Sequence, residues 1–154
     1  MEIRPDDLRG SEIRALLDDH LRHMHEITPA KSVHALALDD LRNPDISVWT
    51  VWDGDALIGC GALRELSPTE GEIKSMRTAG AHRNRGVARA MLNHILDEAR
   101  RRGYRRLSLE TGSMAAFEPA RRLYASAGFE PCGPFGDYVD DPNSVFMTKV
   151  LQFG

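Results

Sequence analysis

The spacing of hydrophobic residues along the chain predicts four helices. Apolar residues recur every three or four positions over residues 11–27, where Ser11 is the expected N-cap. A second, shorter helix is expected over 32–41. Two further amphipathic segments are each followed by glycine, which commonly ends helices, and they cover residues 86–102 and 117–127.

Runs of β-branched, aromatic and alternating residues predict strands between these helices. The expected strands cover residues 3–4, 46–52, 56–66, 72–78, 107–110, 129–131 and 144–151. The first half of the chain is typical of a meander, with a hairpin turn at Asp53-Gly54-Asp55. The second half contains strand–helix–strand crossovers, which favour parallel pairing. The sequence therefore predicts one α/β domain over residues 1–154, with a mixed central sheet covered by helices.

Composition excludes several classes of protein. The formal net charge of -3 argues against a nucleic-acid partner. No apolar run approaches the ~18 residues of a membrane span, and the N-terminal residues lack the apolar core of a signal peptide. Cys60 and Cys132 lie far apart without neighbouring ligands, which predicts free thiols, no metal site and a cytoplasmic protein.

The segment Arg83-Asn84-Arg85-Gly86-Val87-Ala88 lies between an expected strand and the start of the helix over 86–102. The first N–H groups of a helix have no partner within the helix, and its dipole favours an anion there. Gly86 would let a bulky anion approach the backbone, and the arginines add charged donors. This pattern favours a phosphate or pyrophosphate site, although a basic turn before a surface helix is the alternative.

A second segment, Ala120-Arg121-Arg122-Leu123-Tyr124-Ala125-Ser126-Ala127-Gly128-Phe129, has the pattern Ala-x-x-Leu-Tyr-x-x-x-Gly-Phe. Together with the Arg/Gln-x-x-Gly-x-Gly/Ala pattern of the first loop, it resembles the GNAT superfamily of acyl-CoA N-acyltransferases. The resemblance implies a twisted, mixed but mostly antiparallel sheet of six to seven strands, flanked by about four helices. One departure is Phe117, because members of the family often have Asn at this position.

The resemblance also implies a donor and its binding residues. The donor is acetyl-CoA, and no metal is required. The residues implied to hold the pyrophosphate are Arg83, Asn84, Arg85, Gly86, Val87 and Ala88. The backbone of Met76 and Thr78 is implied to bind the pantetheine arm as an additional strand would.

Tyr124 matches the general acid of the family, and Glu72 resembles its base. A phenol has an ordinary pKa near ~10, close enough to the ~8.5 of a thiol to share a proton with the leaving sulfur. Strand alternation places Glu72, Lys74, Met76 and Thr78 on one face. For each residue a non-catalytic alternative stays open. Tyr124 could be only a packed aromatic residue, and Glu72 could face solvent.

The acceptor site is expected near the first helices and the loop over 133–143. Its candidate residues are Ser32, His34, Lys74, Arg77 and Tyr138, and their charge favours a small acceptor that carries a carboxylate. The function that these features favour is transfer of an acetyl group to a primary amine of a small molecule, by direct transfer in a ternary complex. The alternatives are a non-catalytic acyl-CoA sensor and an acetyltransferase for protein lysines or N-termini, and a homodimer is one arrangement that the family implies.

Overall fold

The computed structural model describes residues 1–80 and 85–151, so the expected contributions of Arg83 and Asn84 lie outside the described residues. Its centre is a sheet of seven strands in the described part of the chain, in the order β1-β2-β3-β4-β5-β7-β6. All neighbouring pairs are antiparallel except β4 and β5. The strands are β1 (Glu2–Pro5), β2 (Ile46–Asp53), β3 (Ala56–Ser67), β4 (Glu70–Thr78), β5 (Arg106–Gly112), β6 (Glu130–Cys132) and β7 (Ser144–Val150).

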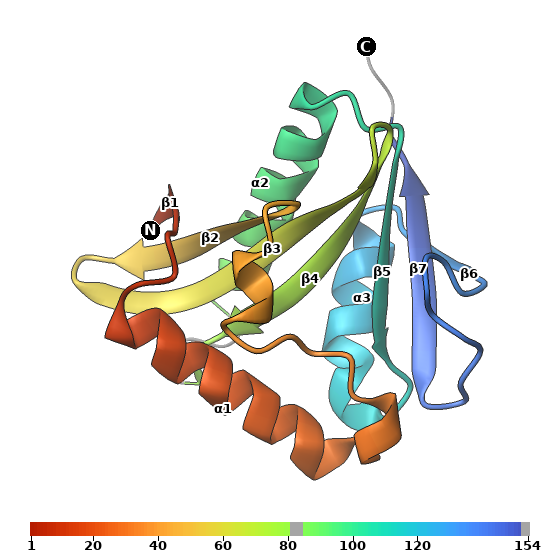
Figure 1. Cartoon of the computed structure of the whole chain (residues 1–154), viewed down its shortest axis with the longest axis horizontal. Helices are drawn as coiled ribbons and strands as arrows, with labels where there is room; N and C mark the ends of the chain where they lie inside the picture. Colours follow the sequence, from red (N-terminus) through yellow and green to blue (C-terminus); the bar gives the residue numbers. More distant parts are fainter. Residues whose placement is uncertain (81–84, 152–154) are drawn as a thin grey trace.

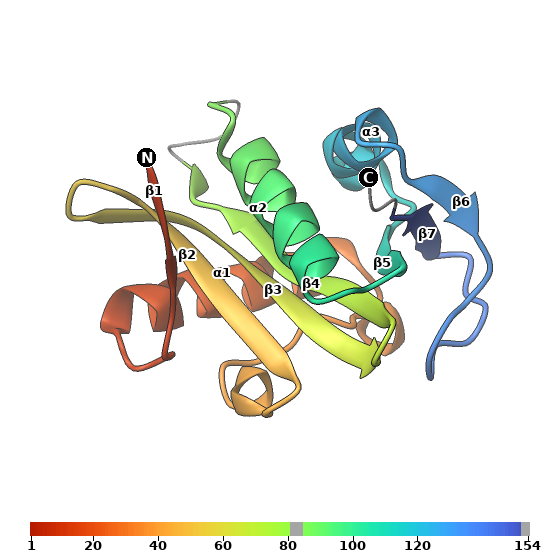
Figure 2. The same ribbon diagram turned by 90° about the horizontal axis from the view of Figure 1, so that it is seen from above.

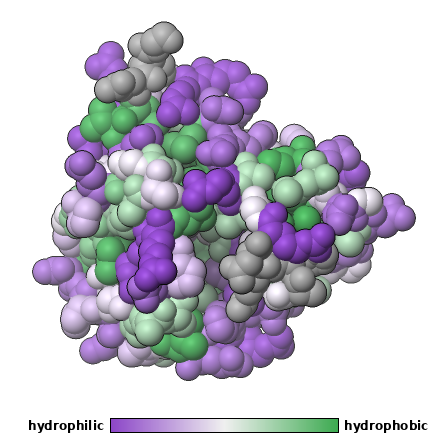
Figure 3. Space-filling view, turned by 180° about the vertical axis from the view of Figure 1, so that it is seen from behind, coloured by the Kyte–Doolittle hydropathy of each residue, from purple (hydrophilic) through white to green (hydrophobic). Residues whose placement is uncertain are grey.

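Helices cover both faces of this sheet (Figures 1 and 2). On one face lies α1 (Ser11–Ile27), together with the short 3-10 helices η1 (Ala30–Ser32) and η2 (Asp40–Arg42). On the other face lie α2 (Val87–Arg101) and α3 (Glu118–Ser126), and η4 (Ala115–Phe117) precedes α3. The predicted mixed, mostly antiparallel sheet is therefore confirmed. The outer surface on the α2 and α3 side is mostly hydrophilic, with small separate hydrophobic areas (Figure 3).

Each face of the sheet has its own hydrophobic core. The larger core joins α2 and α3 to the sheet through residues such as Met91, Ile95 and Leu109. The smaller core joins α1 to β2 and β3 through residues such as Leu17 and Val48. The amphipathic spacing of both helices is the reason, because it gives each helix one apolar stripe that must be buried against the sheet.

Glycine lets α2 pack close to β3. A Cβ atom built on Gly59 would lie 2.7 Å from Cγ1 of Val87, and one built on Gly61 would lie 2.6 Å from Cγ of Met91. Both distances are too short for a real side chain. The two glycines therefore determine how near the beginning of α2 lies to β3.

The parallel strands β4 and β5 pair over a short distance and then separate. Their register covers Glu70 to Glu72 of β4, although β4 continues to Thr78 and β5 continues to Gly112. Because only three residues of β4 pair with β5, the edge of β4 beyond Glu72 has no strand partner from β5. This separation opens the sheet near its middle.

An irregularity in β4 corrects the prediction that Glu72, Lys74, Met76 and Thr78 share one face. The register between β3 and β4 shifts between Cys60 and Ala62, and Ser75 has a left-handed φ of 56°. A bulge adds one residue and so reverses the alternation of side chains. Glu72 and Lys74 therefore face the α1 side, whereas Met76 packs against the core on the α2 side.

Two predictions about the N-terminal third were wrong. The segment over 32–41 forms no α-helix, because burial of Leu38 and Leu41 in the smaller core holds it in an irregular path that ends in η2. The described residues consequently contain three α-helices instead of about four. The N-cap of α1 is Gly10 instead of Ser11, whose hydroxyl donates to the Glu12 carboxylate at 2.9 Å.

Candidate active site

One large cleft follows the opening between β4 and β5. Its volume is about 1080 Å³, and its walls come from α1, β4, the start of α2, β5 and α3. This volume is at the upper end of the range that small ligands usually occupy. The cleft brings together the two segments that the sequence analysis singled out, since Gly86 and Tyr124 both line it.

The first turn of α2 provides one end of the cleft. Gly86 is the N-cap with a left-handed φ of 79°, and no side chain of the described residues caps the helix. The first bond within the helix runs from the Ala90 N–H to the Gly86 carbonyl at 3.0 Å, so the N–H groups of Val87 and Ala88 have no partner within the helix. A Cβ atom built on Gly86 would meet no atom of residues 1–80 and 85–151 within 4 Å. Within that part of the chain, the helix terminus is open to a large anionic group.

The unpaired edge of β4 provides the adjoining wall, and Met76 and Thr78 lie on it. Backbone groups on such an edge are free to bind an extended, amide-bearing ligand as an additional strand would. Their side chains point to the α2 side and leave the backbone edge exposed to the cleft. The structure therefore fits the backbone role expected for these two residues.

Tyr124 lies on α3, where it packs against Phe129 with ring centroids 5.8 Å apart and also lines the cleft. Burial raises the pKa of its hydroxyl above the ordinary value for a phenol. The phenol therefore stays protonated at neutral pH and is a hydrogen-bond donor. Tyr124 both packs in the core and lines the cleft. Its interpretation as a packed aromatic residue therefore does not exclude its interpretation as a general acid.

Phe117, the departure from the family pattern, has a structural partner. A Cβ atom built on Gly112 would lie 2.2 Å from the Phe117 ring, so the ring lies directly on the end of β5. Nη1 of Arg121 donates to the carbonyls of Gly112 and Met114 at 2.7 and 3.0 Å and holds this turn against α3. Both Phe117 and Gly112 line the cleft.

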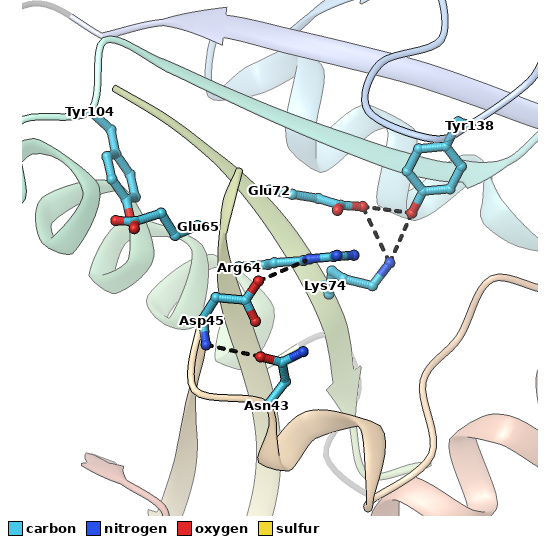
Figure 4. Close-up of polar contacts among 8 residues, drawn as sticks. All are labelled: Asn43, Asp45, Arg64, Glu65, Glu72, Lys74, Tyr104 and Tyr138. Carbon is cyan, nitrogen blue, oxygen red and sulfur yellow. Dashed lines mark hydrogen bonds and ion pairs between the residues drawn. The ribbon is translucent and has the colours of Figure 1, made fainter. Parts of the chain in front are cut away.

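On the α1 side, Glu72, Lys74 and Tyr138 form a compact polar cluster (Figure 4). Oε2 of Glu72 accepts a hydrogen bond from the Tyr138 hydroxyl at 2.6 Å and another from Nζ of Lys74 at 3.2 Å. Nζ of Lys74 also donates to the Tyr138 oxygen at 2.8 Å. Glu72 is only 1% exposed, so the alternative that it faces solvent is wrong.

The loop over 133–143, which contributes Tyr138, is tied to the segment after α1. The Ser32 hydroxyl donates to Oδ2 of Asp141 at 2.6 Å, and Nδ2 of Asn143 donates to the Ser32 oxygen at 3.3 Å. His34 packs edge-on against the Tyr138 ring, with centroids 5.0 Å apart. Ser32, His34 and Tyr138, three of the residues expected at the acceptor site, thus lie together.

Arg77 lies farther along the α1 side of the cleft, where its Nη2 donates to Oδ2 of Asp19 at 2.8 Å. Several buried polar atoms on this wall make no hydrogen bond within the described structure. They are Nδ1 of His20, Oγ1 of Thr28, Oγ of Ser75 and Nε of Arg77. All four residues line the cleft, although these particular atoms are buried beneath its surface.

Sequence analysis missed Glu110 on β5, which also lines the cleft. Burial raises the pKa of its carboxyl to about 7, the neighbouring charges of Glu72 and Asp141 add to this effect, and Lys74 and the Ser144 hydroxyl oppose it. The available signal was alternation: Leu107 and Leu109 are buried in the core on one face, which places Ser108 and Glu110 on the other.

Comparison with known proteins agrees with this architecture. Residues 12–129 match the model of the Acetyltransferase (GNAT) family. The chain is 58% identical to the uncharacterized N-acetyltransferase YsnE of Bacillus subtilis, covering 98% of this chain and 100% of the relative. It is 46% identical to the uncharacterized N-acetyltransferase YedL of Escherichia coli, covering 97% and 94%. A GNAT acetyltransferase structure from Elizabethkingia anophelis with acetyl-CoA bound has the same fold, with a TM-score of 0.69, 19% identity and 97% of each chain covered.

These similarities define the class of protein: the chain is an acyl-CoA-dependent N-acyltransferase. It belongs to the GNAT acetyltransferase family, as the two sequence motifs predicted. Within residues 1–80 and 85–151, no helix has the length and apolar character needed to cross a membrane.

Proposed function

We propose that the protein transfers an acetyl group from acetyl-CoA to a primary amine of a small molecule, by direct transfer while both substrates are bound. The observation that supports this most is the single cleft, which connects the open N-terminus of α2 to a polar cluster on the opposite side of the sheet. One end suits an anionic donor and the other suits a polar acceptor, and the gap between β4 and β5 joins them.

For the donor, the N–H groups of Val87 and Ala88 and the dipole of α2 would hold the pyrophosphate, and Gly86 leaves room for it. The backbone of Met76 and Thr78 would hold the pantetheine amides. The bound donor supplies an acyl group on a sulfur leaving group. Arg85 belongs to the same loop, and the expected contributions of Arg83 and Asn84 stay predictions.

The chemistry needs a neutral amine and a proton for the leaving sulfur. Tyr124 lines the cleft and would donate a hydrogen bond to that sulfur, since burial raises the pKa of its phenol and keeps it protonated. Glu72, the base that the resemblance implies, already accepts hydrogen bonds from Tyr138 and Lys74. It lies on the acceptor side of the cleft, where the amine would enter.

For the acceptor, Ser32 and His34 line one region of the cleft, with Tyr138 packed behind His34, and Thr28 and Arg77 line another. This polar wall favours a small molecule with several hydrogen-bonding groups. A carboxylate on the acceptor stays a hypothesis. Lys74 is paired with Glu72 and Arg77 is paired with Asp19, so a carboxylate on the acceptor would have to compete with these two carboxylates.

Calorimetric titration with acetyl-CoA tests the donor site. Gly86→Glu places a carboxylate at the N-terminus of α2 and is expected to weaken acetyl-CoA binding at least tenfold. Gly54→Glu is the matched control, because Gly54 also has a left-handed φ, of 59°, has open space around it and lies in the β2–β3 turn. The control should bind acetyl-CoA as wild type does.

Thiol release from acetyl-CoA in the presence of a panel of primary amines then tests the reaction. Absence of acetyl-CoA binding by wild type would refute the proposed function entirely. Binding without turnover of any amine would instead favour the acyl-CoA sensor.

A further inference from the structure

Two cleft carboxylates of the described residues, Glu110 and Glu118, have no role in the mechanism above, and Glu118 is paired with Arg122 on α3. Glu110 lies two residues beyond Ser108, which pairs with Glu72 at the last point where β4 and β5 are joined. Glu110 therefore lies where the strands have separated, and residues two apart on a strand share a face. Its partner on β7 is Phe146, whose ring lies 5.5 Å from the ring of Tyr138. Glu110 thus faces the α1 side of the cleft, where Glu72, Lys74 and Tyr138 lie.

The surroundings of the two carboxylates differ. Oε2 of Glu72 accepts two hydrogen bonds, one of them from the Lys74 ammonium, whose side chain is only 9% exposed. Protonating Glu72 would leave a buried cation without its counterion, which is costly. The Glu72 carboxylate is therefore poorly suited to take up a proton during turnover.

Among the residues that the structure describes, Glu110 has no comparable ion pair. Charged and titratable groups that act on it are Glu72 and Lys74 from β4, together with Tyr138 and Asp141 from the loop before β7. Burial and the two neighbouring carboxylates raise its pKa to about 7, against the opposing effects of Lys74 and the Ser144 hydroxyl. Such a carboxylate is a stronger base than an ordinary one and still loses its proton near neutral pH.

We propose that Glu110 is the catalytic residue that accepts the proton from the acceptor's ammonium group, and that Glu72 instead positions Lys74 and Tyr138. This role rests on the proposed function. The N–H bond of the ammonium breaks as the proton moves to Glu110, and the freed lone pair bonds to the acyl carbon while the C=O π pair moves onto oxygen. The C=O double bond then re-forms as the C–S bond breaks with its electron pair on sulfur. The nitrogen loses a second proton, the sulfur gains one with the help of Tyr124, and Glu110 releases its proton to solvent.

The test compares Glu110→Gln with Glu72→Gln, with Glu12→Gln as a control on the exposed first turn of α1. Thiol release from acetyl-CoA is measured with the best amine of a panel that includes ethanolamine, tyramine and lysine, between about pH 5 and 9. Glu110→Gln is expected to lower kcat about a hundredfold or more and to remove the acidic limb of the kcat/KM profile. Its acetyl-CoA affinity should stay within about twofold of wild type.

Glu72→Gln should keep the acidic limb and mainly raise KM for the amine, as a positioning role requires. Carbon-13 NMR of the glutamate carboxyl groups provides a second readout that needs no acceptor. One carboxyl should titrate near neutral pH in wild type and be missing in Glu110→Gln.

The proposal is overturned if Glu110→Gln keeps the acidic limb, if Glu72→Gln loses it, or if no glutamate titrates near neutral pH. Binding of acetyl-CoA without turnover of any amine by wild type is a different result. It would refute the proposed function and, with it, the role of Glu110.

Discussion

At the scale of single residues, the cleft places groups of opposite character on the two sides of the sheet. Tyr124 lies on the α2 and α3 side and is protonated because burial disfavours its anion. Glu72 and Glu110 lie on the α1 side among polar partners. An acceptor entering from the α1 side would meet a carboxylate first, and the leaving sulfur would be nearer to the phenol.

Tyr124→Phe tests this division of roles. The substitution removes one hydroxyl and keeps the ring that packs on Phe129, so the melting temperature should change little. We expect kcat to fall about a hundredfold or more, with acetyl-CoA affinity nearly unchanged, because the lost proton donor acts only during transfer. Unchanged kcat, measured by thiol release, would mean that Tyr124 is only a packed aromatic residue.

At the scale of elements, the position of α2 depends on the glycines of β3. Gly59 contacts both the beginning of α2 and the end of β4, the two elements that form the donor side of the cleft. The N-terminus of α2 and the end of β4, which together form the proposed donor site, therefore both lie close to Gly59.

Gly59→Ala is expected to disturb both elements. The added methyl group would lie 2.7 Å from Cγ1 of Val87 and 3.1 Å from the Arg77 carbonyl oxygen, and a β-branched side chain and a backbone atom have little freedom to move. Overpacking of this kind typically destabilises by about 1–3 kcal/mol. We expect a lower melting temperature by calorimetry and weaker acetyl-CoA binding. Gly80→Ala, whose added methyl group would meet no atom of the described residues within 4 Å, is the control that should show neither effect.

At the scale of the whole molecule, two buried groups give opposite pH dependence to stability. Burial, and next the charge of Arg77, lower the pKa of His20 in the folded protein to about 4. The unfolded chain therefore takes up a proton on His20 as pH falls below about 6.5, and the folded protein does not, so stability falls with pH. Glu110 has a raised pKa of about 7, so its contribution is present at low pH and is lost as pH rises through that value.

His20→Gln separates the two effects. The difference between a pKa of about 4 and the ordinary 6.5 corresponds to about 3 kcal/mol. Relative to the variant, wild type should therefore gain stability by up to this amount as pH rises from about 4 to 6.5. Urea unfolding of both proteins at several pH values measures this difference. A difference that does not change with pH would contradict the neutral, buried state of His20.

Most of the architecture was predictable from the sequence because the elements are strongly patterned. The amphipathic stripes of α1 and α2, the Gly54 turn and the crossovers around β5 determined the element order and the mixed sheet. The two family motifs identified the class. The prediction of a helix over 32–41 was wrong because the apolar residues of this segment are buried by tertiary contacts and do not form a helical stripe.

The site was predictable only in part, and the reason is physical. Sequence alone identified the α2 terminus, Tyr124 and Glu72, because each belongs to a local pattern. The bulge at Ser75, which turns Glu72 and Lys74 away from the face of Met76, depends on pairing with β3. The enclosure of Glu72 by Tyr138, from 66 positions along the chain, and the burial of Glu110 exist only once distant segments meet. Local sequence patterns thus identified the candidate residues. The tertiary structure decided which of them lie on the same face, which are paired, and how burial changes their pKa.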